Sequence, residues 1–144
     1  MLARRPLSEA EVALRLERKG VPPREAAGTV ARLRELGLLD DGGLCRRLAV
    51  SCQEVRRYGP AKIARYLSAR RFPRNLVESA LREVAPAAAE AAAAALRKRF
   101  PGGVPPGRDG AARAYRFLAG RGFPPEICRS AVGRPASDSP EGED

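Results

Sequence analysis

Residues 56–73 read RRYGPAKIARYLSARRFP, and this stretch predicts the local structure from which the rest of the chain follows. A glycine–proline pair starts a helix, because glycine tolerates unusual backbone angles and proline presets the first helical turn. Ile63, Tyr66 and Leu67 then recur at the spacing of one helix face. Pro73 ends the helix, since proline cannot continue it and restricts the residue before it.

The same pattern occurs three times. A shift of 51 residues superimposes a leucine, a basic residue, a hydrophobic residue and a proline without a gap. The three sets are Leu16, Lys19, Val21 and Pro22; Leu67, Arg70, Phe72 and Pro73; and Leu118, Arg121, Phe123 and Pro124. Each set predicts a helix, a corner and a second helix, so the chain is a tandem repeat.

The repeat predicts an all-α fold of elongated tandem three-helix units, the last of them truncated. We expect helical repeat 1 at residues 1–57, basic repeat 2 at 58–100, a linker at 101–107, truncated repeat 3 at 108–133 and a disordered acidic tail at 134–144. Aromatic residues make up 5% of the chain and alanine supplies much of its apolar content, which indicates a thin core between closely spaced helices.

Local signals place several helix ends. Ser8 and Glu11 have the spacing of a capping box, and Asp40–Asp41 offers an N-cap for a helix over about residues 43–57. Lys19, Arg70 and Arg121 fall in the last turn of a first helix, where a cation offsets the negative end of the helix dipole. The inner sides of the intervening helices are expected to hold Ala26, Ala27, Val30 and Leu33, and Leu44, Leu48, Cys52 and Val55.

Positive charge is concentrated in the middle of the chain. The formal net charge is +10, and residues 46–82 contain ten Lys/Arg against two Glu. Residues 134–144, in contrast, carry one Arg and four acidic side chains. A GC-rich genome can raise the total number of arginines without any functional reason. It accounts less well for their clustering in one part of the chain, so the charge indicates an anionic partner.

The candidate binding surface consists of basic residues for which the sequence offers few acidic neighbours, together with one tyrosine beside them. They are Arg46, Arg47, Arg56, Arg57, Tyr58, Lys62, Arg65, Arg71 and Arg74. Tyr58 is a candidate for stacking on bases. Tyr66 is better explained by core packing, because it lies beside Ile63 and Leu67.

Enzymatic chemistry is not indicated. The chain has no His, and it has neither a phosphate-binding loop nor a dinucleotide-binding glycine motif. Cys45 and Cys52 are expected to fill the core, so we expect no metal and no cofactor. An odd count of three cysteines is typical of a reducing cytoplasm, and the alanine-rich stretch near 87–95 is too short to span a membrane. We expect a cytoplasmic monomer without a membrane partner.

Leu38-Leu39-Asp40-Asp41, Tyr58-Gly59-Pro60-Ala61-Lys62-Ile63 and Arg70-Arg71-Phe72 resemble the RecX family, the bacterial modulators of the RecA recombinase. The resemblance covers about residues 4–132. It implies tandem three-helix repeats without catalytic activity, which dock along the groove of the RecA–DNA filament and inhibit its recombinase, ATPase and coprotease functions. Arg71 departs from the repeat, because the first and third copies have Gly20 and Gly122 there.

Two other interpretations stay open. The chain is alternatively a stand-alone basic helical module that binds single- or double-stranded DNA through phosphates, in which case naked DNA is bound with a steep salt dependence. A third interpretation is a basic adaptor for an acidic protein, which requires no DNA.

Overall fold

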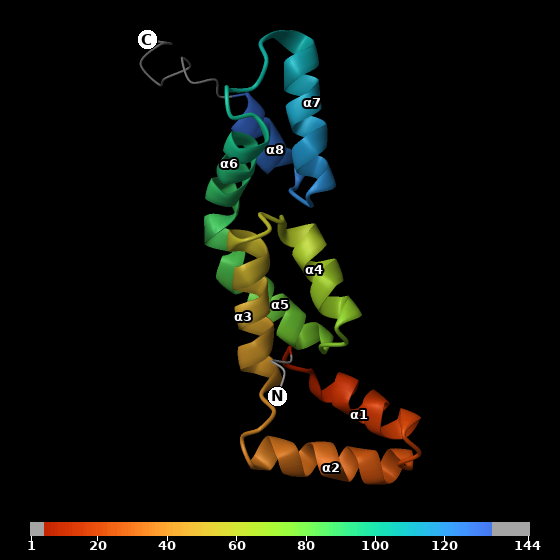
Figure 1. Cartoon of the computed structure of the whole chain (residues 1–144). Helices are drawn as coiled ribbons and strands as arrows, with labels where there is room; N and C mark the ends of the chain where they lie inside the picture. The colour runs from red at the N-terminus through yellow and green to blue at the C-terminus, as the bar shows by residue number, and fades with distance from the viewer. Residues whose placement is uncertain (1–4, 134–144) are drawn as a thin grey trace.

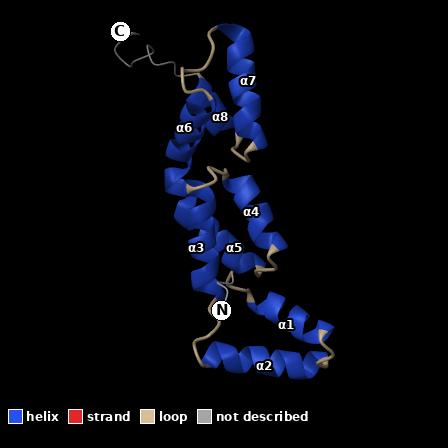
Figure 2. Ribbon diagram, viewed as in Figure 1, coloured by secondary structure: helices blue, strands red, loops and turns tan. Residues whose placement is uncertain are grey.

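The computed structural model describes residues 5–133, and within that range the regular structure is helical (Figure 1, Figure 2). The predicted all-α fold is confirmed. The helices are α1 (Glu9–Arg18), α2 (Pro23–Glu35), α3 (Asp41–Glu54), α4 (Pro60–Ala69), α5 (Arg74–Val84), the short 3-10 helix η1 (Ala85–Ala87), α6 (Ala88–Arg99), α7 (Gly107–Gly120) and α8 (Pro125–Val132).

The 51-residue repeat reappears as three helical hairpins: α1–α2, α4–α5 and α7–α8. The first helix of each hairpin ends at the repeated basic position, with Lys19, Arg70 and Arg121 as C-caps. The second helix begins after the repeated proline, with Pro22, Pro73 and Pro124 as N-caps. The sequence pattern therefore marks the same corner of the backbone in all three copies.

Side-chain caps fix two of the helix starts as predicted. At α1 the Ser8 hydroxyl accepts from the Glu11 N–H at 3.1 Å, while the Ser8 N–H donates to the Glu11 carboxylate at 2.8 Å. At α3 the Asp40 carboxylate accepts from the Gly43 N–H at 3.1 Å. These bonds satisfy N–H groups that a helix leaves without internal partners.

The hairpins stack end to end into an elongated body, with α3 and α6 running beside the stack (Figure 1). One core joins α3 to the α4–α5 hairpin, and a second joins α6 to the α7–α8 hairpin. The largest buried members are Leu44, Ile63, Leu67, Phe72, Val77 and Val84 in the first core, and Leu96, Phe100, Leu118 and Phe123 in the second. Each long connecting helix thus packs on the hairpin that follows it in the chain.

Two predicted core positions are wrong. Val55 is 69% exposed, because α3 ends at Glu54 and Val55 caps it instead of continuing its inner side. Ala27 is exposed on α2, where Ala26 and Val30 are the buried residues. The acidic tail expected at 134–144 lies outside the described residues.

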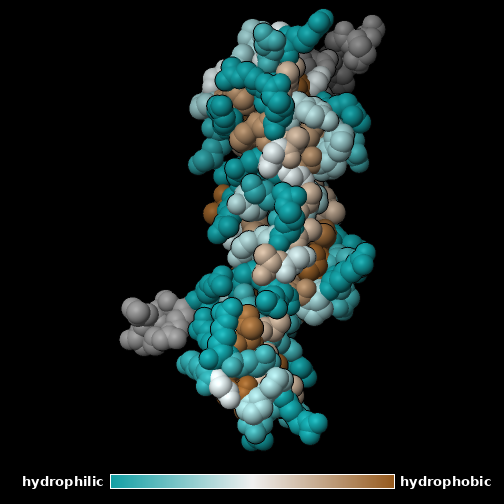
Figure 3. All heavy atoms as spheres, turned by 90° about the vertical axis from the view of Figure 1, so that its right-hand side faces the viewer, coloured by the Kyte–Doolittle hydropathy of each residue, from teal (hydrophilic) through white to brown (hydrophobic). Residues whose placement is uncertain are grey.

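The helices of the described chain are too short or too polar to cross a bilayer. The face formed by the right-hand side of Figure 1 is mostly hydrophilic, with separate hydrophobic patches between the polar side chains (Figure 3).

Candidate functional site

The hairpins meet at two joints, and the first joint connects α1 to the end of α4. The Ser8 hydroxyl donates to the carbonyl of Arg70 at 2.8 Å. The Arg70 guanidinium in turn binds the Glu11 carboxylate through two hydrogen bonds of 2.7 and 3.0 Å, and it donates to the Pro6 carbonyl at 2.6 Å. Ser8 and Arg70 are both buried. This joint is closed by an internal ion pair.

The ion pair shifts the titration of both partners. Burial of Glu11 opposes its ionisation, but the hydrogen bonds from Arg70 and from the Ser8 N–H, with the nearby positive charge, outweigh it and lower the pKa of Glu11. The hydrogen bond to Glu11 raises the pKa of Arg70 despite burial. Both groups are therefore charged at neutral pH, as a buried pair of this geometry requires.

The second joint connects α4 to the end of α7 through backbone hydrogen bonds. The Gly59 N–H donates to the Arg121 carbonyl at 2.7 Å, and the Ala61 N–H donates to the Gly122 carbonyl at 3.1 Å. These are N–H groups at the start of α4 that its own helix leaves free. A shift of 51 residues carries Ser8 to Gly59 and Arg70 to Arg121, so the two joints lie at equivalent positions of the repeat.

The charges differ between the copies. The position of Glu11 in the first joint is occupied by Lys62 in the second. Tyr58 there is approached by three cations: its ring centroid lies 4.7 Å from the Lys62 ammonium, 5.3 Å from the Arg121 guanidinium and 5.9 Å from that of Arg56. The second joint therefore gathers cations around an aromatic ring instead of neutralising them with a carboxylate.

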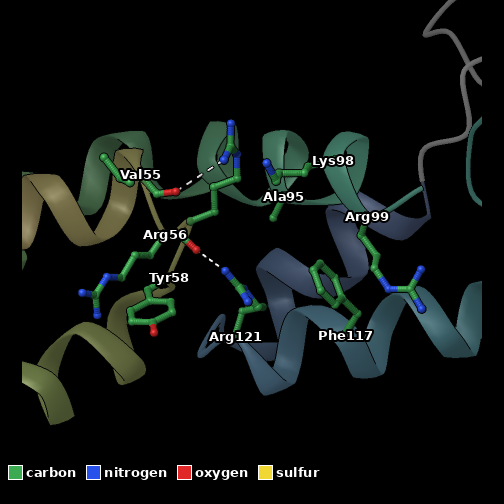
Figure 4. A pocket seen from close by; sticks show the side chains of 9 residues that line it. Val55, Arg56, Tyr58, Ala95, Lys98, Arg99, Phe117 and Arg121 are labelled. Carbon is green, nitrogen blue, oxygen red and sulfur yellow. Dashed lines mark hydrogen bonds between the residues drawn. The ribbon is translucent and has the colours of Figure 1, made fainter. Parts of the chain in front are cut away.

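A pocket of about 460 Å³ opens at this joint, between the α3–α4 connection, α6 and α7. Figure 4 shows Arg121 between Tyr58 and Phe117, with Lys98 and Arg99 on the α6 side. The lining consists of Val55, Arg56, Arg57, Tyr58, Ala95, Lys98, Arg99, Phe117 and Arg121. We call this the joint pocket. Five cations line it, and the residues described there include no Asp or Glu.

Two guanidinium nitrogens at the joint pocket lack a partner. Nε of Arg57 and Nε of Arg121 are buried, and within residues 5–133 neither finds an acceptor. Each side chain does reach one backbone carbonyl: Arg121 donates to the Arg56 carbonyl, and Arg57 makes a long 3.5 Å contact with the Val55 carbonyl. A buried donor without an acceptor is costly, so the hydrogen-bonding capacity of these two arginines is not fully used within the described structure.

The other predicted site residues fall into two groups. Arg46 and Arg47 line a shallow depression of about 480 Å³ with Val50 and Glu83, and this depression adjoins the joint pocket at Val55. Arg65, Arg71 and Arg74 are exposed on the α4–α5 hairpin. The structure thus brings Arg56, Arg57, Tyr58 and Lys62 together, places Arg46 and Arg47 beside them, and leaves the last three apart.

Acidic neighbours are less scarce than the sequence indicates. Arg46 lies 3.7 Å from the Glu83 carboxylate, and Arg74 forms a 3.0 Å ion pair with Glu78 one turn along α5. Exposed pairs of this kind contribute little to stability. They do reduce the number of cations that a partner finds uncompensated.

Of the nine residues that line the joint pocket, the sequence predicted three as site residues: Arg56, Arg57 and Tyr58. Arg121 was explained by its place at a helix end, which the structure confirms, but it also enters the pocket. Lys98, Arg99 and Phe117 come from helices outside the basic stretch. The repeat itself contained a signal for this site. Aligning the copies places Lys62 at the position of Glu11, which shows that the second joint lacks the carboxylate of the first.

The cysteines and the paired aspartates have structural roles. Cys45 and Cys52 lie in the first core, as predicted, and burial raises the pKa of Cys45 to about 11. Asp41 accepts from the Glu9 N–H at 2.9 Å and so ties α1 to α3, a contact between segments far apart in sequence. Among the described side chains, no three acidic or cysteine ligands converge on a metal position.

Two parts of the chain match models of known protein domains. Residues 1–33 match the model described as RecX, first three-helix domain, and residues 88–132 match RecX, third three-helix domain. The second stretch covers α6, α7 and α8, the three helices that share the second core.

Whole-chain comparisons agree with these matches. The chain is 38% identical over 124 residues to Regulatory protein RecX of Thermus thermophilus, which covers 86% of this chain and 79% of the relative. It is 32% identical over 142 residues to the protein of the same name from Halorhodospira halophila, covering 99% and 88%. The crystal structure of RecX from Lactobacillus salivarius superimposes with a TM-score of 0.77 at 19% identity, over 90% of this chain and 85% of that one.

Proposed function

The chain belongs to the RecX family, and from that premise we propose that it is a non-catalytic regulator that binds the RecA–DNA filament and inhibits its recombinase, ATPase and coprotease activities. The partner surface comprises the joint pocket, the adjoining depression and the exposed arginines of the α4–α5 hairpin, Arg65, Arg71 and Arg74. The observation that carries the proposal is the cluster of cations without acidic partners at the second joint. The exposed side chains of Val50 and Val55 lie beside this cluster.

The shape of the molecule suits a groove. The stacked hairpins form a narrow rod (Figure 1), and a rod can contact several successive subunits of a filament. Apolar side chains surrounded by cations suit a surface that contains both protein and nucleic-acid phosphates. A protein seated there occupies the space that a second DNA strand or a cleavage substrate needs.

Backbone strain supports a role for two of the arginines. In residues 5–133 the non-glycine residues with positive φ are Arg57 (φ 56°) and Arg71 (φ 67°). A left-handed backbone costs a non-glycine residue roughly 1 kcal/mol or more. Both belong to the predicted binding surface, and strained positions often coincide with functional ones.

The proposal is tested on RecA assembled on single-stranded DNA, by following ATP hydrolysis and strand exchange as the protein is added. We expect saturable inhibition. Replacing Arg47, Arg65 and Arg71 by Gln removes three exposed cations outside the joint pocket and should weaken inhibition. The matched control replaces Arg18, Arg24 and Arg32, which are exposed on the α1–α2 hairpin, and should leave inhibition in place.

The outcomes separate the alternatives. Inhibition that responds equally to both triple variants indicates dependence on net charge alone and contradicts a defined surface. Tight binding to naked DNA without any effect on the filament favours the stand-alone DNA-binding module. Absence of inhibition at saturating protein contradicts the proposal.

A further inference from the structure

The two joints lie at equivalent positions of the repeat but are closed by different means: the Ser8 hydroxyl bonds to the Arg70 carbonyl in the first, and backbone N–H groups of α4 bond to the end of α7 in the second. In the first, the Glu11 carboxylate sits against the Arg70 guanidinium, with both side chains largely shielded from solvent. In the second, Lys62 takes the place of Glu11, and Arg121 takes the place of Arg70. The basic residue of the first joint therefore has a basic counterpart in the second, whereas the acidic residue does not.

Lys62 is held at this joint by the backbone. A Cβ built on Gly122 would lie 2.5 Å from the Lys62 backbone nitrogen and 2.7 Å from its Cβ, so the α7 corner lies directly against Lys62. The Lys62 ammonium lies 4.7 Å from the ring centroid of Tyr58, which lines the joint pocket, and none of the five cations of that pocket is in an ion pair within the described part of the chain. The site is therefore built to hold positive charge without neutralising it.

We propose that the joint pocket is a phosphate-binding site, and that a bound phosphate group closes the second joint as Glu11 closes the first. The inference rests on the proposed function in placing the joint pocket on the partner surface, and it adds a ligand class that the pocket binds without the filament. Arginine side chains present paired donors that match phosphate oxygens, and the guanidinium groups of Arg57 and Arg121 at the pocket have no carboxylate partner in the described part of the chain.

Phosphate fits the site better than a carboxylate does. Five cations line the pocket, whereas a single carboxylate brings one negative charge and two oxygens. Phe117 and Tyr58 add aromatic faces on which a nucleobase can stack. A volume of about 460 Å³ lies in the range of sites that hold small organic ligands, so a phosphate carried by a nucleotide fits.

The test measures binding to the full-length protein by calorimetry and by the shift in Tm, without RecA and at constant ionic strength. The probes are pyrophosphate, a short oligothymidylate and a tetraglutamate peptide. We expect pyrophosphate or the oligothymidylate to raise Tm by about 5 °C near saturation and the peptide to have little effect. A response to pyrophosphate identifies free phosphate as sufficient, whereas a response to the oligonucleotide alone identifies a nucleic-acid source.

The decisive variant is Lys62→Glu, which places a carboxylate where the first joint has Glu11. It should raise Tm without any ligand and weaken phosphate binding by about tenfold or more. Arg24→Gln, which removes an exposed cation on α2, should bind phosphate as the parent protein does. In parallel, the Nε–H NMR signals of Arg57 and Arg121 should shift on titration.

Three results would overturn the inference: no binding of either phosphate probe, equal binding by Lys62→Glu and the parent protein, or preferential binding of the tetraglutamate peptide. If Lys62→Glu fails to fold, Arg57→Gln replaces it and must show the same loss. Because RecA is absent, failure here leaves the filament proposal to its own test.

Discussion

Gly59 and Gly122 meet backbone to backbone at the second joint. A Cβ on Gly59 would lie 2.5 Å from the carbonyl carbon and oxygen of Gly122. The contact lets the first N–H groups of α4 reach the carbonyls that end α7. Because the two backbones lie so close together, neither Gly59 nor Gly122 has room for a side chain.

Gly122→Ala should therefore weaken this joint. The new Cβ would collide with the backbone of Lys62, in addition to the strain of φ 96°, and we expect a loss of about 2 kcal/mol or more in the free energy of unfolding. Gly20→Ala is the matched control, because Gly20 occupies the equivalent repeat position with φ 100° and meets nothing within 4 Å. Chemical denaturation of both variants measures the difference, and equal losses would contradict the close contact.

Glu11→Ala should open the first joint. It leaves the Arg70 guanidinium, with a side chain only 7% exposed, without its carboxylate, and we expect a loss of about 3 kcal/mol. Glu78→Ala serves as the control, since it breaks the solvent-exposed pair with Arg74 and should cost less than about 1 kcal/mol. Similar effects of the two substitutions would show that the first joint contributes no more than a surface ion pair.

The same pair predicts a pH dependence. The pKa of Glu11 is lowered in the folded protein from its ordinary value of 4.5, so its contribution is complete above that value and is lost as the pH falls through the lowered pKa. Asp41 changes in the opposite direction, because burial raises its pKa. The difference in unfolding free energy between the parent protein and Glu11→Gln isolates Glu11, and it should shrink in acid. A difference that stays constant to low pH would contradict the ion pair.

Arg71→Gly should separate stability from binding. Glycine relieves the left-handed strain at φ 67° and restores the residue found in the other two copies, so we expect a gain of about 0.5–1 kcal/mol. The same change removes a cation of the proposed partner surface and should weaken binding to the filament. Thermal unfolding and a filament-binding assay measure the two effects. A gain in stability with unchanged binding would remove Arg71 from the surface.

Much of the fold follows from local chemistry that the sequence displays. The 51-residue repeat, the capping box at Ser8 and the helix ends at Lys19, Arg70 and Arg121 depend on residues close together in the chain, and the structure has them where the pattern predicts. The same holds for Tyr66, which packs against the first core.

The joints were not predictable in the same way. Glu11 and Arg70 are 59 residues apart, and no periodicity shows which repeats touch or which of their ends meet. The prediction for Val55 was wrong for a related reason: its spacing continues the apolar side of α3, but the helix ends at Glu54. The repeat shows which positions are equivalent. Only the packing of the hairpins shows which charged side chains lie close together across a joint.

The most direct test of the central claim is co-sedimentation of the protein with RecA filaments on single-stranded DNA, at several salt concentrations. We expect saturable binding that the Arg47, Arg65 and Arg71 triple variant weakens by about tenfold or more, while the Arg18, Arg24 and Arg32 control binds as the parent protein does. A parent protein that stays in the supernatant at low salt would contradict the claim that this rod docks on the filament through its basic surface.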